Sequence, residues 1–367
     1  MTPLSGLKVV ELARILAGPW IGQSLADLGA EVIKVEAEAG DDTRHWGPPF
    51  IERDGDKTAA YYYAANRGKD CVTADFRTPE GRQTVLDLIK DADILIENFK
   101  VGGLKKYGLD YDSLKEVNPR LIYCSVTGFG QDGPYAARAG YDFLLQGMSG
   151  LMSITGDPEG QPQKVGVAIT DIVTGLYGTI GILAAVEQRH TTGRGQHLDM
   201  SLLDCATAML ANQAMNYLAT GTSPVRLGND HPNIAPYQVM AVQDGHIILA
   251  VGNDGQFQRL CDVLDLPDLK VDARFLTNQS RVANRTDLTA ILEAALMQWT
   301  QADLLKALEA ATVPAGPINT IGQAFDDPQI QHRGMQISPE GVPGVRGPWK
   351  FSDAELALDK SAPKLAK

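Results

Sequence analysis

The sequence predicts an α/β protein, in which a large domain built on a parallel sheet is followed by a smaller α+β domain. Within the first 130 residues, short runs rich in β-branched residues alternate with helical patterns. Repetition of strand, helix and strand is typical of a parallel sheet covered by helices. The chain has 367 residues, enough for roughly two domains. A Gly-, Pro- and Asn-rich stretch at 220–235 is the best candidate for a connection between them.

Buried strands and intervening helices are predicted in the first third of the chain. The strands are Leu7–Leu12, Glu31–Glu36, Cys71–Phe76, Ile94–Glu97 and Leu121–Val126. One helix is predicted at Pro19–Leu28 and another at Pro79–Asp91, where Thr78 is placed to cap the helix and Pro79 to begin it. This part of the chain is therefore predicted to form a Rossmann-like sheet.

The middle of the chain is predicted to be mostly helical. The least polar stretch, 172–186, has no charged residue and is shorter than a membrane span, so we predict a buried helix. Gly175, Gly178 and Gly181 recur along roughly one face of it and would let another backbone approach closely. A strand at His197–Met200 and a helix to about Ala219 follow.

The second half is predicted to be a smaller α+β domain. Its strand is expected at Gly245–Val251, and its helices at Gln256–Leu264 and Leu288–Ala311. We therefore expect a large domain at 1–200, a linker at 201–225, a small domain at 226–325 and a C-terminal segment at 326–367 that returns to the large domain.

Composition and charge exclude several classes of partner. The formal net charge is −12, which argues against nucleic acid or an anionic membrane surface as the main partner. Four scattered cysteines among apolar neighbours indicate buried free thiols, and six scattered histidines give no metal-site spacing. The N-terminal residues contain no apolar run of signal-peptide length, so we expect a cytoplasmic protein.

One dinucleotide-binding fingerprint is present in the wrong place. Gly128–Gly133 matches G-x-G-x-x-G, but it follows about the fifth strand and leads into Pro134. A dinucleotide fold needs this motif after the first strand, at the start of a helix. We therefore interpret the motif as a turn and expect no nucleotide redox cofactor.

Asp171 is the most informative single residue. It stands where Gly166–Thr170 meets the apolar helix predicted from about Ile172. An aspartate at a helix start is usually an N-cap. The same position suits a nucleophile, because the helix dipole favours the carboxylate anion. The residues alone leave both interpretations open.

Ordered matches through nearly the whole chain resemble the class III coenzyme A transferases, the family that also contains the α-methylacyl-CoA racemases. The matching blocks are Ala17–Pro19, Leu28–Glu36, Asp41–Arg44, Glu97–Phe99, Ala139–Asp142, Gly150–Met152, Thr155–Gly156, Gly166–Gly175 and Thr192–Gly195. The resemblance implies a CoA-transferase, with coenzyme A present as a substrate thioester and with no metal.

The resemblance also assigns roles residue by residue. It places the catalytic nucleophile at Asp171. It places coenzyme A contacts at Leu16, Ala17, Asp75, Phe76, Arg77, Asn98, Phe99, Lys100, Lys106, Ala139, Gly140, Tyr141 and Asp142. Leu16 and Ala37 stand where some transferases have Gln and Arg, so those contacts are weakened or replaced here, and Arg14 is a candidate replacement.

Tyr141 favours the transferases over the racemases. Racemases of this family have a histidine at this position, which moves a proton beside the thioester. A phenol with an ordinary pKa of about 10 is poorly suited to that task. The implied mechanism is instead covalent, through an aspartyl anhydride and an aspartyl-CoA thioester. A 2-methylacyl-CoA racemase and a non-catalytic coenzyme A-binding protein remain the alternatives.

Within the family, the chain resembles the members that exchange coenzyme A between succinyl-CoA and glutarate. The implied donor is succinyl-CoA, and the implied acceptor is a C4–C6 dicarboxylate. Candidate cations for its distal carboxylate are Arg44, Arg226 and His231. The segment Gly252, Asn253, Asp254, Gly255 and Gln256 corresponds to a glycine-rich lid in the family, with a simple strand–helix turn as the alternative. The family fold further implies ring-shaped chains in an interlocked homodimer.

Overall fold

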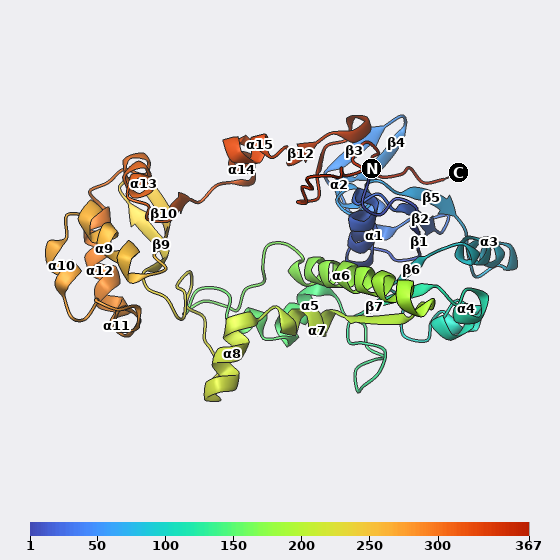
Figure 1. The fold of residues 1–367 in the computed structure, drawn as a ribbon, viewed down its shortest axis with the longest axis horizontal. Coiled ribbons are helices and arrows are strands. Elements are labelled where there is room, and N and C mark those ends of the chain that lie inside the picture. Colours follow the sequence, from blue (N-terminus) through green and yellow to red (C-terminus); the bar gives the residue numbers. More distant parts are fainter. Residues whose placement is uncertain (367) are drawn as a thin grey trace. The chain divides into compact units, whose positions relative to one another are not determined.

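The computed structural model describes residues 1–366 and divides them into two compact units (Figure 1). The large unit contains residues 1–151, 164–222 and the described residues from Asp327 onward, and the small unit contains 152–163 and 223–326. Residues 201–222, expected to belong to a linker, lie in the large unit and form α7 (Leu202–Ala208) and α8 (Ala211–Thr220). A linker does not form there because α7 buries Leu202, Cys205 and Ala206.

A single parallel sheet organises the large unit. Within residues 1–366 its strands are β1 (Lys8–Glu11), β2 (Glu31–Glu36), β5 (Asp70–Thr73), β6 (Ile94–Glu97), β7 (Ile122–Thr127) and β8 (His197–Ser201). Their order across the sheet is β5-β2-β1-β6-β7-β8. The chain thus builds outward from β1 in one direction and from β6 in the other, as in doubly wound Rossmann folds. The predicted Rossmann-like sheet is confirmed.

Alternate residues of the central strands face two different cores. Val9 and Ile94 pack with α1 (Ala17–Asp27) and α6 (Ile169–Thr192), whereas Val10 and Leu95 pack with α3 (Pro79–Lys90) and α4 (Tyr111–Val117). Successive side chains of a strand point to opposite faces, and helices cover both faces here. The strands therefore appear in the sequence as continuous apolar runs.

Helix α6 is the longest helix among the described residues and packs closely on α1. A Cβ on Gly175 would lie 2.8 Å from the Trp20 ring, and one on Gly178 would lie 2.5 Å from Ile21 Cδ1. The close approach predicted from the glycine spacing is confirmed. Helix α6 has 24 residues and contains an 18-residue window with a mean hydropathy of 1.6, so it could cross a membrane by length and composition alone. Its glycine face, however, packs inside the large unit like that of a core helix.

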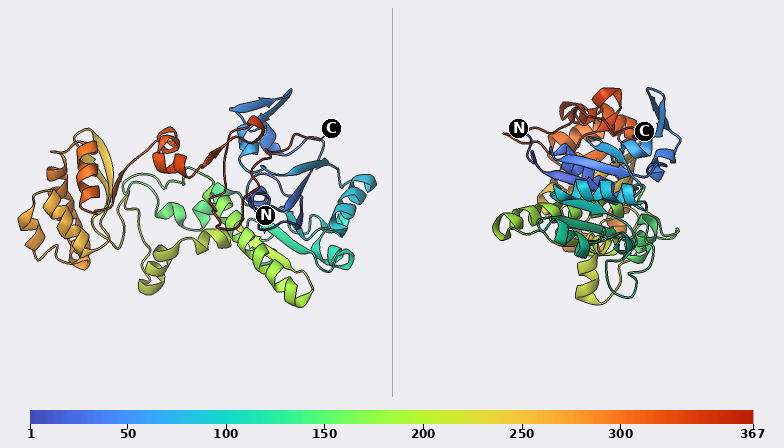
Figure 2. Two further views of the ribbon diagram at one scale, coloured as in Figure 1. Left: turned by 45° about the horizontal axis from the view of Figure 1, so that its top comes forward. Right: turned by 90° about the vertical axis from the view of Figure 1, so that its right-hand side faces the viewer.

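The C-terminal segment belongs to the large unit. Figure 2 shows it running beside β3 (Phe50–Arg53) and β4 (Asp56–Ala59). Arg67 Nη1 donates to the Val345 carbonyl, 2.8 Å away. The remaining elements of this unit are η1 (Asp42–His45), α2 (Ala60–Tyr63), η2 (Lys105–Tyr107), α5 (Asp142–Met148), α15 (Pro328–His332), β12 (Gln336–Ile337), η4 (Pro339–Gly341) and β13 (Gly344–Val345), and η3 (Leu151–Ser153) lies where the chain passes to the small unit.

The small unit is an antiparallel sheet with helices on it. Among the described residues the sheet order is β11 (Ala315–Pro317), β10 (Gly245–Ala250) and β9 (Tyr237–Val242). The helices are α9 (Asp254–Val263), α10 (Pro267–Val271), α11 (Asn278–Ala283), α12 (Arg285–Leu296), α13 (Gln301–Ala310) and α14 (Ile321–Asp326). The single helix expected at Leu288–Ala311 is wrong: Thr300 accepts from the Asp303 N–H and begins a new helix, α13.

The four cysteines are free thiols, as predicted. Cys124, Cys205 and Cys261 are buried, and Cys71 is half-buried.

Candidate active site

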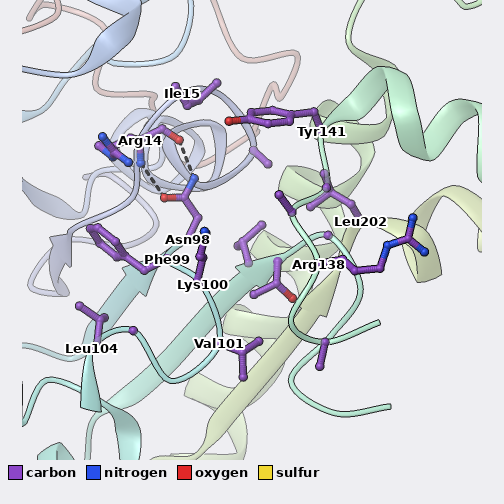
Figure 3. A pocket seen from close by; sticks show the side chains of 18 of the residues that line it. Arg14, Ile15, Asn98, Phe99, Lys100, Val101, Leu104, Arg138, Tyr141 and Leu202 are labelled. Carbon is purple, nitrogen blue, oxygen red and sulfur yellow. Dashed lines mark hydrogen bonds between the residues drawn. The ribbon is translucent and has the colours of Figure 1, made fainter. Parts of the chain in front are cut away.

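A cavity of about 520 Å³ lies at the carboxyl ends of the central strands of the parallel sheet. Its wall is formed by the turns that follow β1, β6 and β7, together with Asp171 in the first turn of α6 (Figure 3). In doubly wound sheets, ligands bind in the crevice where the strand order reverses. The order reverses here between β1 and β6, so the fold itself indicates this cavity as the functional site.

Most of the residues that the resemblance assigns to coenzyme A lie together in this wall. They are Leu16, Ala17, Phe76, Arg77, Asn98, Phe99, Lys100, Lys106, Ala139, Gly140 and Tyr141. Asp75 is not part of the wall: its carboxylate is held by Arg77 instead, with Nη2 2.7 Å from Oδ2. Asp75 is thus placed to orient Arg77, and its own contact with coenzyme A stays a prediction.

The cavity is positively charged although the chain is acidic. Among the described residues in its wall, the cations are Arg14, Arg77, Lys100, Lys106 and Arg138, and the only carboxylate is Asp171. Arg14 and Arg77 are paired with Asp42 and Asp75, which lie outside the wall. The remaining cations supply most of the positive potential, which suits a polyanionic ligand. Arg138 was not among the predicted site residues, although it directly precedes Ala139, the first residue of a matching block.

The turn after β1 is fastened to the turn after β6. The backbone N–H of Arg14 donates to Asn98 Oδ1 over 2.9 Å, and Asn98 Nδ2 donates to the Arg14 carbonyl over 2.7 Å (Figure 3). The Arg14 guanidinium lies over the Phe99 ring, 5.7 Å from its centroid. Asn98 therefore acts on the backbone of the cavity wall, which the sequence alone did not indicate.

Asp171 lies in the cavity wall but is not the N-cap of α6. The N-cap position is Ala168, and the Thr170 N–H donates to Asp142 Oδ1 over 2.8 Å. Gln146 Nε2 donates to the other Asp142 oxygen over 2.7 Å. Asp142, expected to contact coenzyme A, thus caps the helix that carries Asp171 and lies outside the cavity wall. The carboxylate of Asp171 is left facing the cavity.

The electrostatics of Asp171 differ from the sequence-based expectation. Burial, and after it the nearby charge of Asp142, raises the pKa of Asp171 to about 7. The helix dipole, which we expected to keep the carboxylate ionised, is therefore outweighed by loss of hydration. A carboxylate with this pKa is half-ionised near neutral pH and is more basic than an ordinary aspartate.

Two tyrosines accompany Asp171. Tyr141 is 67% exposed and lines the cavity with its ring near Ile15 (Figure 3). Tyr61, which sequence reasoning missed, has a pKa raised by burial and then by the charge of Asp171. Tyr61 also meets Trp46 edge-to-face, with ring centroids 5.4 Å apart. Only the tertiary fold brings residues 46 and 61 near residue 171.

Arg44 is already engaged and does not line the cavity, contrary to its role as a candidate substrate cation. Its side chain is 4% exposed, and its Nε and Nη2 donate to Glu36 over 2.8 and 2.7 Å. Nη2 also donates to the Tyr62 hydroxyl over 2.6 Å. This buried arginine is part of the core of the large unit.

The other two candidate cations lie in the small unit. Arg226 Nε donates to the Asp157 carbonyl over 3.1 Å, and its Nη2 donates to the Gly160 carbonyl over 3.0 Å. The pKa of His231 is lowered by burial and by Arg285, so this imidazole is neutral near pH 7. The Arg226 guanidinium is thus hydrogen-bonded to backbone carbonyls, and the His231 imidazole lacks the charge that would attract a carboxylate.

The segment 252–256 is the turn between β10 and α9. Asn253 is the N-cap of α9 and accepts from the Gln256 N–H, while Gln256 Oε1 accepts from the Gly252 N–H. Asp254 pairs with buried Arg281 over 2.8 Å. These contacts match the simple turn, the alternative noted from the sequence, and a lid function stays a prediction.

The glycine fingerprint is a turn, as predicted. Gly130 and Gly133 have positive φ values, and the segment leads into no helix at Pro134. Gly128 lies against Gly140, where an added Cβ would come within 2.7 Å of the Gly140 Cα, and both glycines line the cavity. Within residues 1–366, no group of three or more His, Cys, Asp or Glu side chains could hold a metal ion.

Comparison with known proteins identifies the family of this chain. The model of CoA-transferase family III matches residues 4–367. A succinate–glutarate CoA-transferase of Agrobacterium fabrum is 56% identical over 99% of this chain and 93% of its own. The succinyl-CoA:glutarate CoA-transferase of Homo sapiens is 41% identical, covering 99% and 83%. The crystal structure of a CAIB/BAIF family protein from Brucella suis superposes with a TM-score of 0.90 and 62% identity over 99% of this chain and 96% of that one.

Proposed function

Because the chain belongs to CoA-transferase family III, and is thus an enzyme of the EC 2.8.3 type, we propose that it transfers coenzyme A from succinyl-CoA to a C4–C6 dicarboxylate, with glutarate as the first candidate. The observation that carries the proposal is the carboxylate of Asp171, the only one among the described residues of the cation-lined cavity wall at the switch point of the sheet. The relatives named for succinyl-CoA and glutarate support this choice of donor and acceptor.

The proposed mechanism is covalent at Asp171. The carboxylate attacks the succinyl-CoA carbonyl, the C–S bond breaks, and a mixed anhydride and coenzyme A thiolate form. The thiolate attacks the aspartyl carbonyl and releases succinate, leaving an aspartyl-CoA thioester. The acceptor carboxylate then attacks this thioester to give a second anhydride, and the thiolate takes the acceptor acyl group, which restores Asp171. Dividing one difficult exchange into acyl-transfer steps is the advantage of a covalent nucleophile.

The cavity suits this chemistry in two respects. Its cations Arg14, Arg77, Lys100, Lys106 and Arg138 can bind the phosphates of coenzyme A. The raised pKa of Asp171 makes the ionised carboxylate a better nucleophile than an ordinary aspartate. Tyr141, in place of the histidine of the racemases, supports transfer over proton abstraction at the carbon beside the thioester.

We also propose that the enzyme is a homodimer. The described residues of α5, α6 and α8 leave large apolar side chains exposed, including Phe143 at 59%, Ile180 at 61% and Leu218 at 71%. Large apolar side chains exposed on helices are typical of protein–protein contacts. Light scattering on the purified protein should give twice the chain mass, and a monomer at micromolar concentration would contradict this part of the proposal.

A coenzyme A exchange panel tests the function. Purified enzyme is incubated with succinyl-CoA and, separately, with glutarate, adipate, itaconate, malate, oxalate or carnitine, and the thioesters are resolved by mass spectrometry. We expect glutaryl-CoA from the wild type and none from Asp171→Ala. No exchange with any acid, together with deuterium uptake from heavy water into a 2-methylacyl-CoA, would replace the proposal with a racemase.

A further inference from the structure

Ile15 has an unfavourable backbone conformation in the wall of the cavity. Its φ is +73°, in the left-handed region that glycine adopts readily and a β-branched residue very rarely. Such a conformation persists only where the surrounding structure enforces it, and strained residues of this kind gather at functional sites.

Two fully buried charged side chains form hydrogen bonds with the backbone of the turn that contains Ile15. The Ile15 N–H donates to Asp41 Oδ2 over 3.2 Å, and Lys34 Nζ donates to the Ala13 carbonyl over 2.7 Å. Asp41 and Lys34 are both 0% exposed and form an ion pair of 3.1 Å. They come from β2 and from the loop after it, and neither lines the cavity.

Each of these side chains is in turn held by others. Thr43 donates to Asp41 Oδ1 through its N–H over 3.0 Å and through its hydroxyl over 2.8 Å. Lys34 Nζ also pairs with buried Glu11 over 3.0 Å. Asn98 binds the backbone N–H and the backbone carbonyl of Arg14. Every backbone polar group from the Ala13 carbonyl to the Ile15 amide is therefore hydrogen-bonded to a side chain.

We propose that Asp41 and Lys34 are positioning residues, which hold Ile15 in its left-handed conformation and thereby set the shape of the cavity wall that receives the acyl-CoA. The inference rests on the coenzyme A site proposed above. A buried ion pair contributes little net stability, because the loss of hydration offsets the attraction between the charges. Its placement directly behind a strained turn is therefore better explained by the conformation that it enforces.

Asp41→Asn tests the inference against a matched control. The amide keeps the shape of the side chain but loses the negative charge, which weakens the ion pair with Lys34 and the hydrogen bond from the Ile15 N–H. We expect the dissociation constant of coenzyme A and the KM for succinyl-CoA to rise about tenfold, with kcat changing far less, because the wall moves and Asp171 does not. Asp27→Asn is the control: Asp27 is also buried and is paired with Arg67 over 2.6 Å, away from the turn. It should lower the melting temperature without changing KM.

A double-mutant cycle separates positioning from general loosening of the core. Glycine adopts φ near +73° without a steric cost, so the turn should depend less on Asp41 in the Ile15→Gly background. The tenfold effect of Asp41→Asn on KM should fall to about threefold or less there. If Asp41→Asn does not fold, Thr43→Val removes one hydrogen bond to Asp41, and we expect a smaller rise in KM with the same dependence on residue 15.

Equal KM effects of Asp27→Asn and Asp41→Asn, or additive effects in the cycle, would overturn the inference while leaving the transferase function intact. A wild-type protein that neither binds coenzyme A nor exchanges it would overturn the proposed function first, and the inference with it.

Discussion

The carboxylate of Asp142 caps the helix whose first turn carries Asp171. It accepts the Thr170 N–H over 2.8 Å, and its charge, second to burial, raises the pKa of Asp171 to about 7. One side chain thus fixes the position of the proposed nucleophile and increases its basicity. This relationship leads to predictions on pH dependence and on stability.

Exchange activity should rise with pH through about 7. The attacking form of Asp171 is the anion, and with a pKa raised to about 7 this form is lost as pH falls below that value. kcat/KM for succinyl-CoA, measured from pH 5 to 9, should therefore show an acid limb centred near pH 7. A flat profile down to pH 5 would show that Asp171 keeps an ordinary pKa.

Asp142→Asn serves as the control for this assignment. The amide oxygen can still accept the Thr170 N–H, but the negative charge is gone, so the acid limb should move to lower pH. An acid limb that stays in place would assign the titration to another group.

Ionisation of Asp171 should lower the stability of the folded protein as pH rises. A folded pKa above the unfolded value means that the folded state retains a proton which the unfolded state has lost, so this contribution to stability declines as pH rises from about 4 through 7. Asp171→Asn should therefore raise the melting temperature, and by more at pH 8 than at pH 5. Calorimetry at both pH values measures this difference, and a larger rise in melting temperature at pH 5 would contradict the raised pKa of Asp171.

The cavity cations should contribute to binding of the donor. Truncating Lys100 or Arg138 to alanine removes a positive charge from the cavity wall, and a hydrogen bond to a charged group contributes about 1.5–3 kcal/mol. We expect KM for succinyl-CoA to rise at least about tenfold in each variant, with a weaker dependence on salt. Lys90→Ala, which removes an exposed lysine paired with Asp87 on α3, is the control and should leave KM unchanged.

Arg226 should act in stability rather than in acceptor binding. Its guanidinium donates to the Asp157 and Gly160 carbonyls, so it fastens residues 152–163 to the rest of the small unit. Arg226→Ala should lower the melting temperature, and the KM for glutarate should stay within about twofold of the wild-type value, as expected of a residue that does not touch the substrate. A selective rise in that KM would restore Arg226 as a receptor for the distal carboxylate.

The sequence predicts the parallel sheet well because each central strand is buried on both faces. Continuous apolar runs such as Leu121–Val126 are a strong local signal, and the helices between them imply parallel pairing. Strand β9 was missed, although only the two residues Gln243 and Asp244 separate it from β10, where Val242 pairs with Gly245. The break between α12 and α13 was missed because the apolar spacing of Leu288–Ala311 hides the cap at Thr300.

Site residues could be predicted where they follow the end of a strand. They could not be predicted where their role depends on an ion pair or a hydrogen bond with a residue distant in the sequence. Leu16, Asn98 and Lys100 follow strand ends, and the fold brings strand ends together. The Arg44–Glu36 pair is made in the tertiary structure, as is the contact of Asp142 with the Thr170 amide. No local sequence pattern shows that such a side chain already forms an ion pair or a hydrogen bond within the protein.

The most direct test of the central claim is to trap coenzyme A on Asp171. Enzyme mixed with succinyl-CoA in the absence of acceptor is quenched, and the intact protein and its peptides are weighed by mass spectrometry. The account predicts an adduct of one coenzyme A less one water, located at Asp171, removed by adding glutarate and absent from Asp171→Asn. Exchange at the wild-type rate in Asp171→Asn, or an adduct at a different residue, would contradict it.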